Sequence, residues 1–297
     1  MAPDGETLNP QPEGPRPGRV QRIGLLYAPA IEAARELGTE LEQWLSRLGV
    51  QVWRGSPDEA GQASAPEIAS WDLLFTLGGD GTALRAAHLA APLGVPIVCV
   101  GLGRLSFMAE LTPEDVLKRL PTFLAGDYWR EERALLEGAV VRGGQEVARC
   151  LALNEVCLGR ERCALTLRVA ARVNGGHLAT YIGDAVVVAT ATGSTAYAFA
   201  AGGPILFPES RNLLIVPVAA HLCLLPPLIL PEDAQVELEV VGGNAAGVNA
   251  DGQPLTDLQA GDVVRVRRST TVCTFARLQE RDYFFHTLKA RLYRADS

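Results

Sequence analysis

Residues 71–82 read Trp-Asp-Leu-Leu-Phe-Thr-Leu-Gly-Gly-Asp-Gly-Thr, an apolar run that stops at two adjacent glycines. An alanine-rich stretch over 82–91 follows directly and predicts a helix. Three more apolar runs predict strands, and a stretch with apolar residues at spacings of three and four predicts a helix. The strands are expected at 20–27, 50–53 and 97–100, and the helix at 31–48. Strands alternating with helices at this spacing indicate a doubly wound, parallel α/β sheet.

The sequence pattern changes after about residue 127, where the apolar period drops to two. Apolar and polar residues alternate in 165–173, and the same alternation recurs around 236–240 and 264–267. Such alternation is typical of half-buried strands. Glycine-bearing turns at 142–145 and 174–177 separate these runs. The second half is therefore predicted to be mainly antiparallel β-structure, with one helix near Tyr197 to Ala201.

These patterns predict two domains behind a leader. Residues 1–17 contain five prolines among glycines and polar residues and are expected to be disordered. The α/β domain is expected over 18–127 and the β-rich domain over 128–279.

Composition and charge narrow the possible functions. The chain has 297 residues, 48% of them hydrophobic, and a formal net charge of -7. A broad basic surface for nucleic acid is therefore disfavoured. Anionic substrates would have to be attracted locally, by backbone amides, helix ends, a metal ion or a few arginines.

The cysteines and the longest uncharged stretch indicate the cellular compartment and whether the chain crosses a membrane. The six cysteines contain no Cys-x-x-Cys pair, and no signal peptide precedes them, so they are interpreted as reduced thiols of a cytoplasmic protein. Residues 213–230 lack Asp, Glu, Lys and Arg. Prolines at 217, 226 and 227 interrupt this stretch, so buried strands are favoured over a membrane span.

The turn Gly78-Gly79-Asp80-Gly81-Thr82 is the sharpest local signal of chemistry. Glycines let the backbone approach a ligand closely, and the amides at the following helix start suit phosphate oxygens. A carboxylate in such a turn is understandable if Asp80 accepts a proton from an attacking hydroxyl or holds a magnesium ion. The alternative is a strand-to-helix turn in which Asp80 only caps the helix.

A second signal runs from Gly183-Asp184 through Thr192-Gly193-Ser194-Thr195-Ala196-Tyr197 to Ala201-Gly202-Gly203-Pro204. An apolar strand leads there into small and hydroxylated residues, so a flat base or ribose can lie against the main chain. The hydroxyls of 192, 194 and 195 are candidate partners for its edges, and Tyr197 offers a ring face. A well-packed β-to-α connection is the competing interpretation.

Taken together, these motifs resemble those of the NAD kinases, which phosphorylate the 2′-hydroxyl on the adenosine ribose of NAD. The resemblance also includes Asn154-Glu155 and Asp251-Gly252-Gln253, and the motif order agrees over roughly residues 20–295. It implies an NAD kinase-like fold: a doubly wound parallel α/β domain, then a mainly antiparallel, β-sandwich-like, NAD-binding domain. A C-terminal helix over 280–297 is expected to return to the first domain.

The resemblance implies roles residue by residue. Asp80 matches the family's catalytic base, and no protein ligand to a metal is expected. Asn154 and Glu155 match a pair that hydrogen-bonds NAD. The full set of expected nucleotide-binding positions is Gly79, Gly81, Arg85, Phe107, Asn154, Glu155, Asp184, Thr192, Thr195, Ala196, Tyr197 and Gln253. Core packing is an open alternative for Phe107 and for His221, which matches a family histidine, and an exposed helix position is one for Arg85.

Five departures from the family pattern accompany these matches. Ser106 and Ala185 replace usual glycines, Ala191 replaces a proline, and Gly101 replaces an asparagine. Leu225-Pro226-Pro227 stands where Asn-Arg-Pro is usual, which puts any contact of that arginine in doubt.

The expected activity is transfer of the γ-phosphoryl group of ATP, or of another donor, to NAD, giving NADP. Mg²⁺ or another divalent cation is expected with ATP, and the chain is expected to form a homodimer or homotetramer without nucleic-acid or membrane partners. Two other functions stay open: a lipid or sugar kinase that shares the glycine-aspartate turn, and a non-catalytic dinucleotide sensor.

Overall fold

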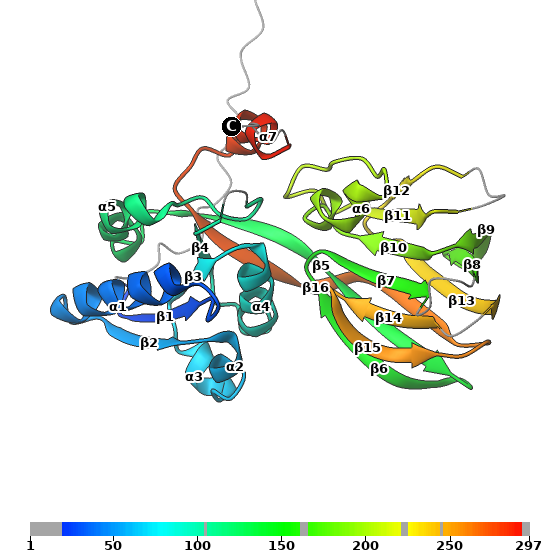
Figure 1. Ribbon diagram of the computed structural model, residues 1–297, viewed down its shortest axis with the longest axis horizontal. Helices are drawn as coiled ribbons and strands as arrows, with labels where there is room; N and C mark the ends of the chain where they lie inside the picture. The colour runs from blue at the N-terminus through cyan, green and yellow to red at the C-terminus, as the bar shows by residue number, and fades with distance from the viewer. Residues whose placement is uncertain (1–19, 104–105, 161–165, 221–224, 244–245, 293–297) are drawn as a thin grey trace, which may run out of the picture.

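The computed structural model describes residues 20–103, 106–160, 166–220, 225–243 and 246–292. Two lobes are joined by two long strands, β5 (Trp129–Arg142) and β16 (Val263–Arg277), which run from one lobe into the other (Figure 1). The predicted leader over 1–17 and His221 lie outside the described residues.

The first lobe is built around four parallel strands in the order β2-β1-β3-β4. Its elements are β1 (Arg22–Tyr27), α1 (Glu32–Arg47), β2 (Gln51–Gly55), α2 (Pro57–Ala60), α3 (Ala65–Ala69), β3 (Leu73–Gly78), α4 (Asp80–Ala90), β4 (Ile97–Gly101) and α5 (Pro113–Leu124). Because strand side chains alternate between faces, the sheet has two apolar faces and needs a helical layer on each. One core joins the sheet to α1 and α5, and the other joins it to α2, α3 and α4. The prediction of a doubly wound α/β sheet is confirmed.

The predicted helices at 31–48, 82–91 and 197–201 agree with α1, α4 and α6 (Tyr197–Ala200) to within two residues, whereas the one predicted over 280–297 starts three residues later, and positions 293–297 lie outside the described residues. Helix α1 follows the predicted spacing, with Leu37, Leu41 and Leu45 buried against the sheet. Helix α4 begins at Asp80 rather than at Thr82, so the aspartate belongs to its first turn. The sequence reasoning missed α5, which starts with Pro113 at its first position and contains Pro121. Prolines normally signal a break, but one at a helix start costs no hydrogen bond.

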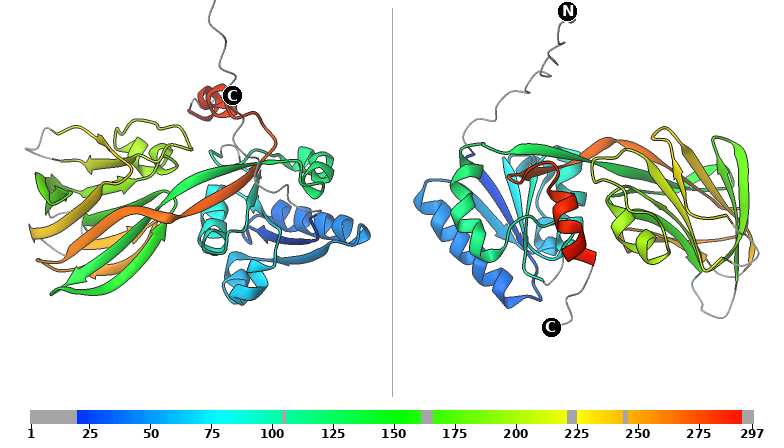
Figure 2. Two further views of the ribbon diagram at one scale, coloured as in Figure 1. Left: turned by 180° about the vertical axis from the view of Figure 1, so that it is seen from behind. Right: turned by 90° about the horizontal axis from the view of Figure 1, so that it is seen from above.

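The second lobe consists of two packed layers of mostly antiparallel strands (Figure 2). The elements besides β5 and β16 are β6 (Gln145–Ala152), β7 (Glu155–Arg160), β8 (Leu167–Val173), β9 (Gly176–Gly183), β10 (Ala185–Ala189), α6 (Tyr197–Ala200), β11 (Leu213–Val218), β12 (Leu228–Leu230), β13 (Gln235–Gly243), β14 (Ala246–Ala250) and β15 (Gln253–Leu258). A six-stranded antiparallel sheet has the order β12-β11-β10-β7-β14-β15. It shares one apolar core with β5, β6, β8, β9, β13 and β16. The predicted second, mainly antiparallel β-layered half is confirmed.

Turn geometry and burial explain two further predictions. Asn174 and Gly175 have φ values of 52° and 78°, the left-handed backbone that a two-residue hairpin turn requires. In the uncharged stretch 213–230, β11 and β12 are strands, as expected. Among the residues that the structure describes, no helix is long and apolar enough to cross a membrane.

The two lobes share one continuous sheet. Strand β16 pairs with β5 along its length. Near its end, Phe275 also pairs in parallel with Ile97 of β4. The α/β sheet is therefore completed by a strand from the C-terminal part of the chain. The final helix, α7 (Tyr283–Leu292), follows β16 and lies above the junction of the lobes in Figure 1.

Candidate active site

The glycine turn lies at the carboxyl edge of the parallel sheet, directly after β3. Gly78 is tightly packed, because a Cβ there would lie 2.5 Å from Thr82 Oγ1. At Gly79 and Gly81 an added Cβ would meet nothing within 4 Å. Core packing therefore does not require these two glycines, which leave open space at the start of α4. The first amides of a helix have no acceptor within the helix, so this opening suits a phosphate group.

Asp80, the first residue of α4, is held by the segment that follows β4. Ser106 Oγ donates to Asp80 Oδ1, and the amide of Met108 donates to the same oxygen at 3.2 Å. The amide of Phe107 donates to Asp80 Oδ2 at 3.0 Å. Sequence reasoning noted Ser106 only as a departure from the family and did not identify this contact.

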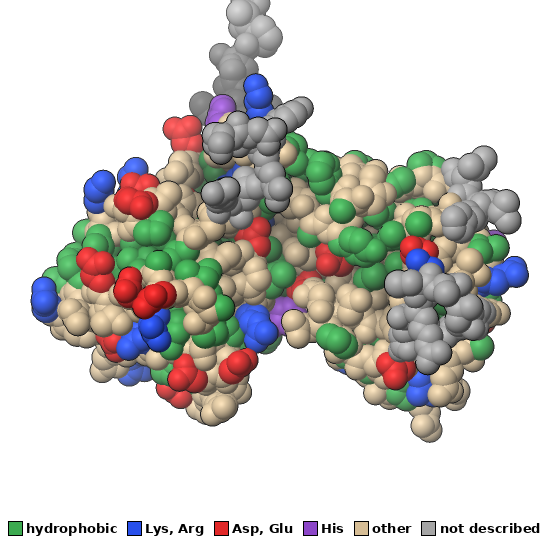
Figure 3. All heavy atoms as spheres, viewed as in Figure 1, with side chains coloured by type: hydrophobic (Ala, Val, Ile, Leu, Met, Phe, Trp, Pro, Cys, Tyr) green, Lys and Arg blue, Asp and Glu red, His purple; other side chains and the backbone are tan. Residues whose placement is uncertain are grey.

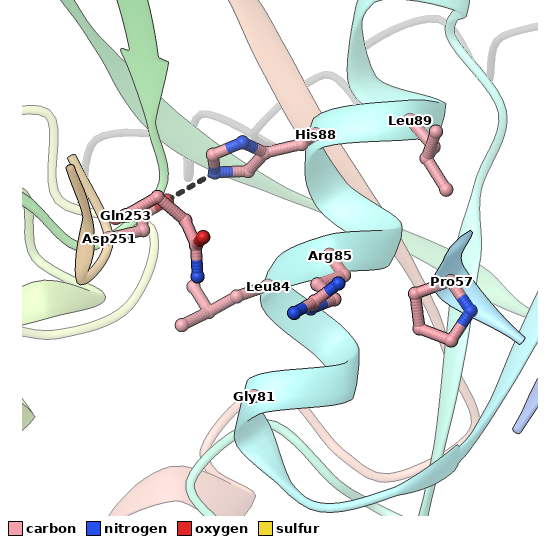
Figure 4. A pocket seen from close by; sticks show the side chains of 8 residues that line it. All are labelled: Pro57, Gly81, Leu84, Arg85, His88, Leu89, Asp251 and Gln253. Atoms are coloured by element: carbon pink, nitrogen blue, oxygen red, sulfur yellow. Dashed lines mark hydrogen bonds and ion pairs between the residues drawn. The ribbon is translucent and has the colours of Figure 1, made fainter. Parts of the chain in front are cut away.

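A hollow of about 470 Å³ lies between α4 and the turn joining β14 to β15 (Figure 4). It is lined by Pro57, Gly81, Leu84, Arg85, His88, Leu89, Asp251 and Gln253. A second hollow of about 320 Å³ lies beside it, against Gly79, Gly81 and the residues that follow β1. The structure thus brings the expected positions 79, 81, 85 and 253 to one region where the two lobes meet. Figure 3 shows acidic, basic and histidine side chains at that junction.

Arg85 points outward from α4 and pairs with Asp58 at 3.1 Å. Both side chains are more than half exposed, and such pairs contribute little to stability. The pair can therefore open at low cost when an anion enters the neighbouring hollows.

Asp251 connects this hollow to the expected NAD-binding pair. Its buried carboxylate accepts from the amides of Leu153, Asn154 and Glu155 at 2.7, 2.7 and 3.1 Å. It also lies 2.6 Å from His88 Nε2, the contact drawn as a dashed line in Figure 4. The backbone of Asp251 has φ 50°, which aspartate tolerates better than most residues. Sequence reasoning quoted Asp251 in a motif but missed its role and missed His88.

Three buried polar atoms near this point have no hydrogen-bond partner among the residues that the structure describes. They are Asn154 Oδ1, Glu155 Oε2 and Thr192 Oγ1. A buried polar group without a partner is costly, so such groups are rare unless a ligand or water satisfies them. The three atoms belong to residues at the start of β7 and just after β10, two strands in register through Glu155 and Ala189.

Burial, and then the nearby charge of Asp251, raise the pKa of Glu155 to about 7. A strongly raised pKa at a partly open site marks a functional candidate.

The small-residue motif packs directly onto this pair. A Cβ on Gly193 would lie only 2.1 Å from the carbonyl oxygen of Asn154, so only glycine fits. Two of the three hydroxyls are used locally: Ser194 Oγ donates to Ala191 O at 2.6 Å, and Thr195 Oγ1 donates to Thr192 O at 3.0 Å. The expectation that Ser194 meets a ligand is wrong, because its side chain is fully buried and also accepts from the amide of Leu206.

The other expected positions lie in this motif, before β10 and beside Asp80. Ala196 and Tyr197 lead into α6, and the Tyr197 side chain is 43% exposed. Asp184, just before β10, pairs with Arg160 at 2.8 Å. Phe107 is half-buried beside Asp80, with the guanidinium of Arg291 5.9 Å from its ring centre. Leu225, in the stretch that replaces Asn-Arg-Pro, packs against the core of the second lobe.

The described residues contain no group of three or more His, Cys, Asp or Glu side chains that could hold a metal ion. The site thus combines open glycines, one carboxylate at a helix start and unpartnered polar atoms. It is suited to binding a nucleotide and moving a proton.

Comparisons with known proteins agree with this geometry. Residues 28–128 match the family model of the ATP-NAD kinase N-terminal domain, and residues 153–278 match that of the C-terminal domain. The chain is 43% identical to an NAD kinase of Chloroflexus aurantiacus over 276 residues, which cover 93% of this chain and all of that protein. It is 37% identical to an NAD kinase of Dehalococcoides mccartyi, over 92% of this chain and 96% of that one.

Solved structures of similar fold include a yeast NADH kinase complexed with NADH, at a TM-score of 0.84 and 23% identity. This match covers 94% of the present chain and 90% of the yeast chain and shows likeness of fold. An NAD kinase from Archaeoglobus fulgidus in complex with ATP matches at a TM-score of 0.74 and 26% identity, over 91% of this chain and 99% of that one.

Proposed function

This chain belongs to the NAD kinase family, and from that premise we propose which of its residues bind the dinucleotide and which one takes the proton. As a member of the family it is an enzyme that phosphorylates NAD to NADP using ATP. The alternatives of a lipid or sugar kinase and of a non-catalytic sensor are set aside.

The binding proposal rests on the three unpartnered buried atoms at the start of β7 and after β10. Asn154, Glu155 and Thr192 offer their free oxygens to hydroxyl and amino groups of the NAD adenosine. Tyr197 offers an exposed ring to the flat base, while Asp184, Thr195 and Ala196 complete the wall of the pocket. Phe107, next to Asp80, and Gln253, in the hollow beside α4, are the remaining proposed contacts.

The triphosphate is assigned to the open start of α4. Gly79 and Gly81 leave room for phosphate oxygens near the helix amides, and Arg85 releases Asp58 to meet them. These local groups supply the attraction that the chain's net negative charge does not.

Magnesium enters this proposal as part of the substrate, bound to ATP. The described residues hold no group of three or more His, Cys, Asp or Glu side chains that could bind a metal ion. A divalent cation neutralises the triphosphate charge in such reactions.

Asp80 is the proposed catalytic base. Phosphoryl transfer passes through a loose transition state, so catalysis depends mainly on alignment, and the base receives the ribose proton late. Oδ1 already accepts two hydrogen bonds from the 106–108 segment, whereas Oδ2 accepts one. Since a carboxylate oxygen can accept two, Oδ2 is the oxygen that takes the proton.

The test is the Asp80→Asn variant, which keeps the shape of the side chain but cannot accept a proton at the amide nitrogen. We expect kcat for NADP formation to fall by about 10²–10⁴-fold, the usual contribution of a general base. NAD binding, measured by calorimetry, should persist, because Asn154, Glu155 and Thr192 are unchanged.

Asp233→Asn is the matched control, since Asp233 is exposed in the turn between β12 and β13. It should keep wild-type turnover. Near-normal kcat in Asp80→Asn, with the control behaving as expected, would remove Asp80 from the role of base.

We also propose a cytoplasmic setting and a homodimer or homotetramer. The four described cysteines are free thiols, and burial raises the pKa of each, so they are kept unreactive and reduced. Val147, Ile229 and Val241 leave large apolar side chains exposed on the β-rich lobe, which supports self-association. Sedimentation velocity measures the oligomeric state directly.

A further inference from the structure

The segment Ser106 to Ala109 contacts Asp80 through three hydrogen-bond donors. The amides of Phe107 and Met108 donate to the Asp80 carboxylate, as does the hydroxyl of Ser106. That hydroxyl is itself fixed, because Ser106 Oγ accepts from the amides of Met108 at 3.2 Å and Ala109 at 2.8 Å. With both lone pairs in use, its single proton goes to Asp80.

The carbonyl side of the same segment is held by two arginines from the end of the chain. Arg291, on α7, donates from its two terminal nitrogens to Phe107 O at 2.9 Å and Ala109 O at 3.2 Å. Arg277, at the end of β16, donates to Met108 O at 2.8 Å. Three consecutive carbonyls are thus bound to guanidinium groups, while the amides face Asp80.

The placement of Arg291 is electrostatically unfavourable in itself. Burial lowers the pKa of Arg291 below its usual range; Tyr283 partly opposes this shift, and the nearby positive charges of Arg277 and Arg133 add to it. Arg277 is completely buried and is balanced by Glu131, whose Oε2 lies 2.7 Å from its Nε. Among the described residues Arg291 has no carboxylate partner within hydrogen-bond distance. The carbonyls of 107 and 109 and the rings of Phe107 and Tyr283, whose centres lie 5.9 and 5.5 Å from its guanidinium, compensate for its burial.

We propose that Arg291 is a positioning residue for phosphoryl transfer: its two-pronged contact with Phe107 and Ala109 keeps the 106–108 segment against the Asp80 carboxylate. This inference rests on the proposed role of Asp80 as the base. Arg291 touches neither substrate and acts only through the segment, by fixing the orientation in which the carboxylate meets the ribose hydroxyl.

The experiment compares Arg291→Ala, Arg291→Lys and the control Lys289→Ala in the full chain. Lys289 is exposed on the same helix. We expect Arg291→Ala to lower kcat about 10–100-fold, since small misplacements of a reacting group can cost that much, with the Kd for NAD changed less than about threefold. In Arg291→Lys, a single ammonium group replaces the two NH donors of the guanidinium, so this variant should recover part of the lost kcat. Lys289→Ala should have the kcat of wild type.

A double-mutant cycle separates positioning from general support of the fold. Ser106→Ala removes the other end of the same chain of contacts. The losses in kcat caused by Arg291→Lys and Ser106→Ala should therefore not multiply, and the second substitution should lower kcat clearly less when the first is present. Fully multiplicative losses in kcat, or an Arg291→Ala variant within twofold of wild-type kcat, would overturn the inference. If Arg291→Ala does not fold, the cycle built on the lysine variant decides alone.

The outcome can be separated from failure of the proposed base. Wild-type turnover in Asp80→Asn rejects Asp80 as base whatever Arg291 does. Loss of turnover in Asp80→Asn, with independent effects of Arg291→Lys and Ser106→Ala, rejects the positioning role and leaves the base in place.

Discussion

Glu155 is a carboxyl group in surroundings that disfavour its charge. Its side chain is buried, one of its oxygens has no hydrogen-bond partner in the described part of the chain, and the Asp251 carboxylate is close enough to repel its charge. In the folded protein its pKa is about 7, against an ordinary value of 4.5. At neutral pH a large share of molecules therefore carry a neutral Glu155, which can donate as well as accept a hydrogen bond.

This raised pKa predicts a specific dependence of stability on pH. Between about pH 4.5 and 7 the folded state binds the Glu155 proton more tightly than the unfolded state does, so rising pH lowers the free energy of unfolding. Glu155→Gln removes that titration. In nucleotide-free protein, thermal unfolding should show that the free energy of unfolding of the variant increases relative to that of wild type as pH rises from 5 to 7.5, by up to about 3 kcal/mol. Glu36→Gln, exposed on α1, is the control. A constant difference across this range would contradict the prediction.

At the level of single residues, the sequence indicated which residues belong to the site better than it indicated what surrounds them in the folded protein. Asn154 and Glu155 were named from their motif, but the raised pKa of Glu155 depends on Asp251, which is distant in sequence. The contact between Ser106 and Asp80 likewise depends on how the chain after β4 folds back on α4. No local pattern encodes either contact.

Helix α4 and the β14–β15 turn form the contact that connects the two parts of the site. His88 reaches from the helix to Asp251, and Asp251 in turn fixes the amides at the start of β7. Besides the shared sheet, the Asp251 carboxylate therefore links the NAD-binding pair directly to the helix that follows the glycine turn.

Asp251→Asn tests this connection. Asparagine also tolerates the positive φ of this position, so the backbone is preserved while one oxygen becomes an amide nitrogen that cannot accept. At least one buried amide loses its acceptor, which should cost about 1–3 kcal/mol of stability. We expect the Kd for NAD, measured by calorimetry, to rise by about tenfold, because Asn154 and Glu155 move when their amides lose this acceptor. Asp257→Asn, exposed on β15, should leave both quantities unchanged. A less stable Asp251→Asn protein with normal NAD affinity would show that Asp251 supports only the fold.

Helices and strands with a clear apolar periodicity could be predicted from the sequence. The pairing of strands that are distant in the sequence could not. The strand, glycine turn and helix over 73–90 follow directly from the apolar run and the alanines after it. The sequence predicted a strand only around 264–267, whereas β16 continues to Arg277. Its last residues include the fully buried Arg277, and hydropathy gives no reason to bury an arginine. The division into domains at 127/128 and 279/280 stays a prediction.

In the whole molecule, the lobes are joined where β5 and β16 lie side by side, and a buried ionic cluster lies at that place. Glu131 accepts from Arg133 and from Arg277, and Phe275 lies 4.8 Å from both guanidinium groups. Burial alone would raise the pKa of Glu131, but the two arginines outweigh it and lower the pKa to about 2.

The cluster predicts sensitivity to acid. Because the folded pKa of Glu131 lies below its ordinary value of 4.5, its contribution to stability is complete above that pH and is lost as pH falls toward 2. Glu131→Gln removes the nearest counter-ion of two buried arginines, leaving Arg277 with Glu110 at 3.7 Å, and should cost about 3–5 kcal/mol at pH 7 in urea unfolding. The difference from wild type should shrink as the pH is lowered from 4.5. Glu132→Gln, the exposed neighbour, should differ little from wild type at any pH. An acid-independent difference for Glu131→Gln would show that the carboxylate charge is not what stabilises the cluster.

The pairing of β16 with β4 also constrains how the molecule is made. During translation, the ribosome releases β4 long before it releases the strand that covers the open edge of β4. Until that late segment emerges, the nascent sheet presents unpaired backbone groups, the kind of edge that invites aggregation. We therefore expect an N-terminal fragment that ends before β16 to aggregate more readily than the full chain, because it lacks the strand that pairs with β4.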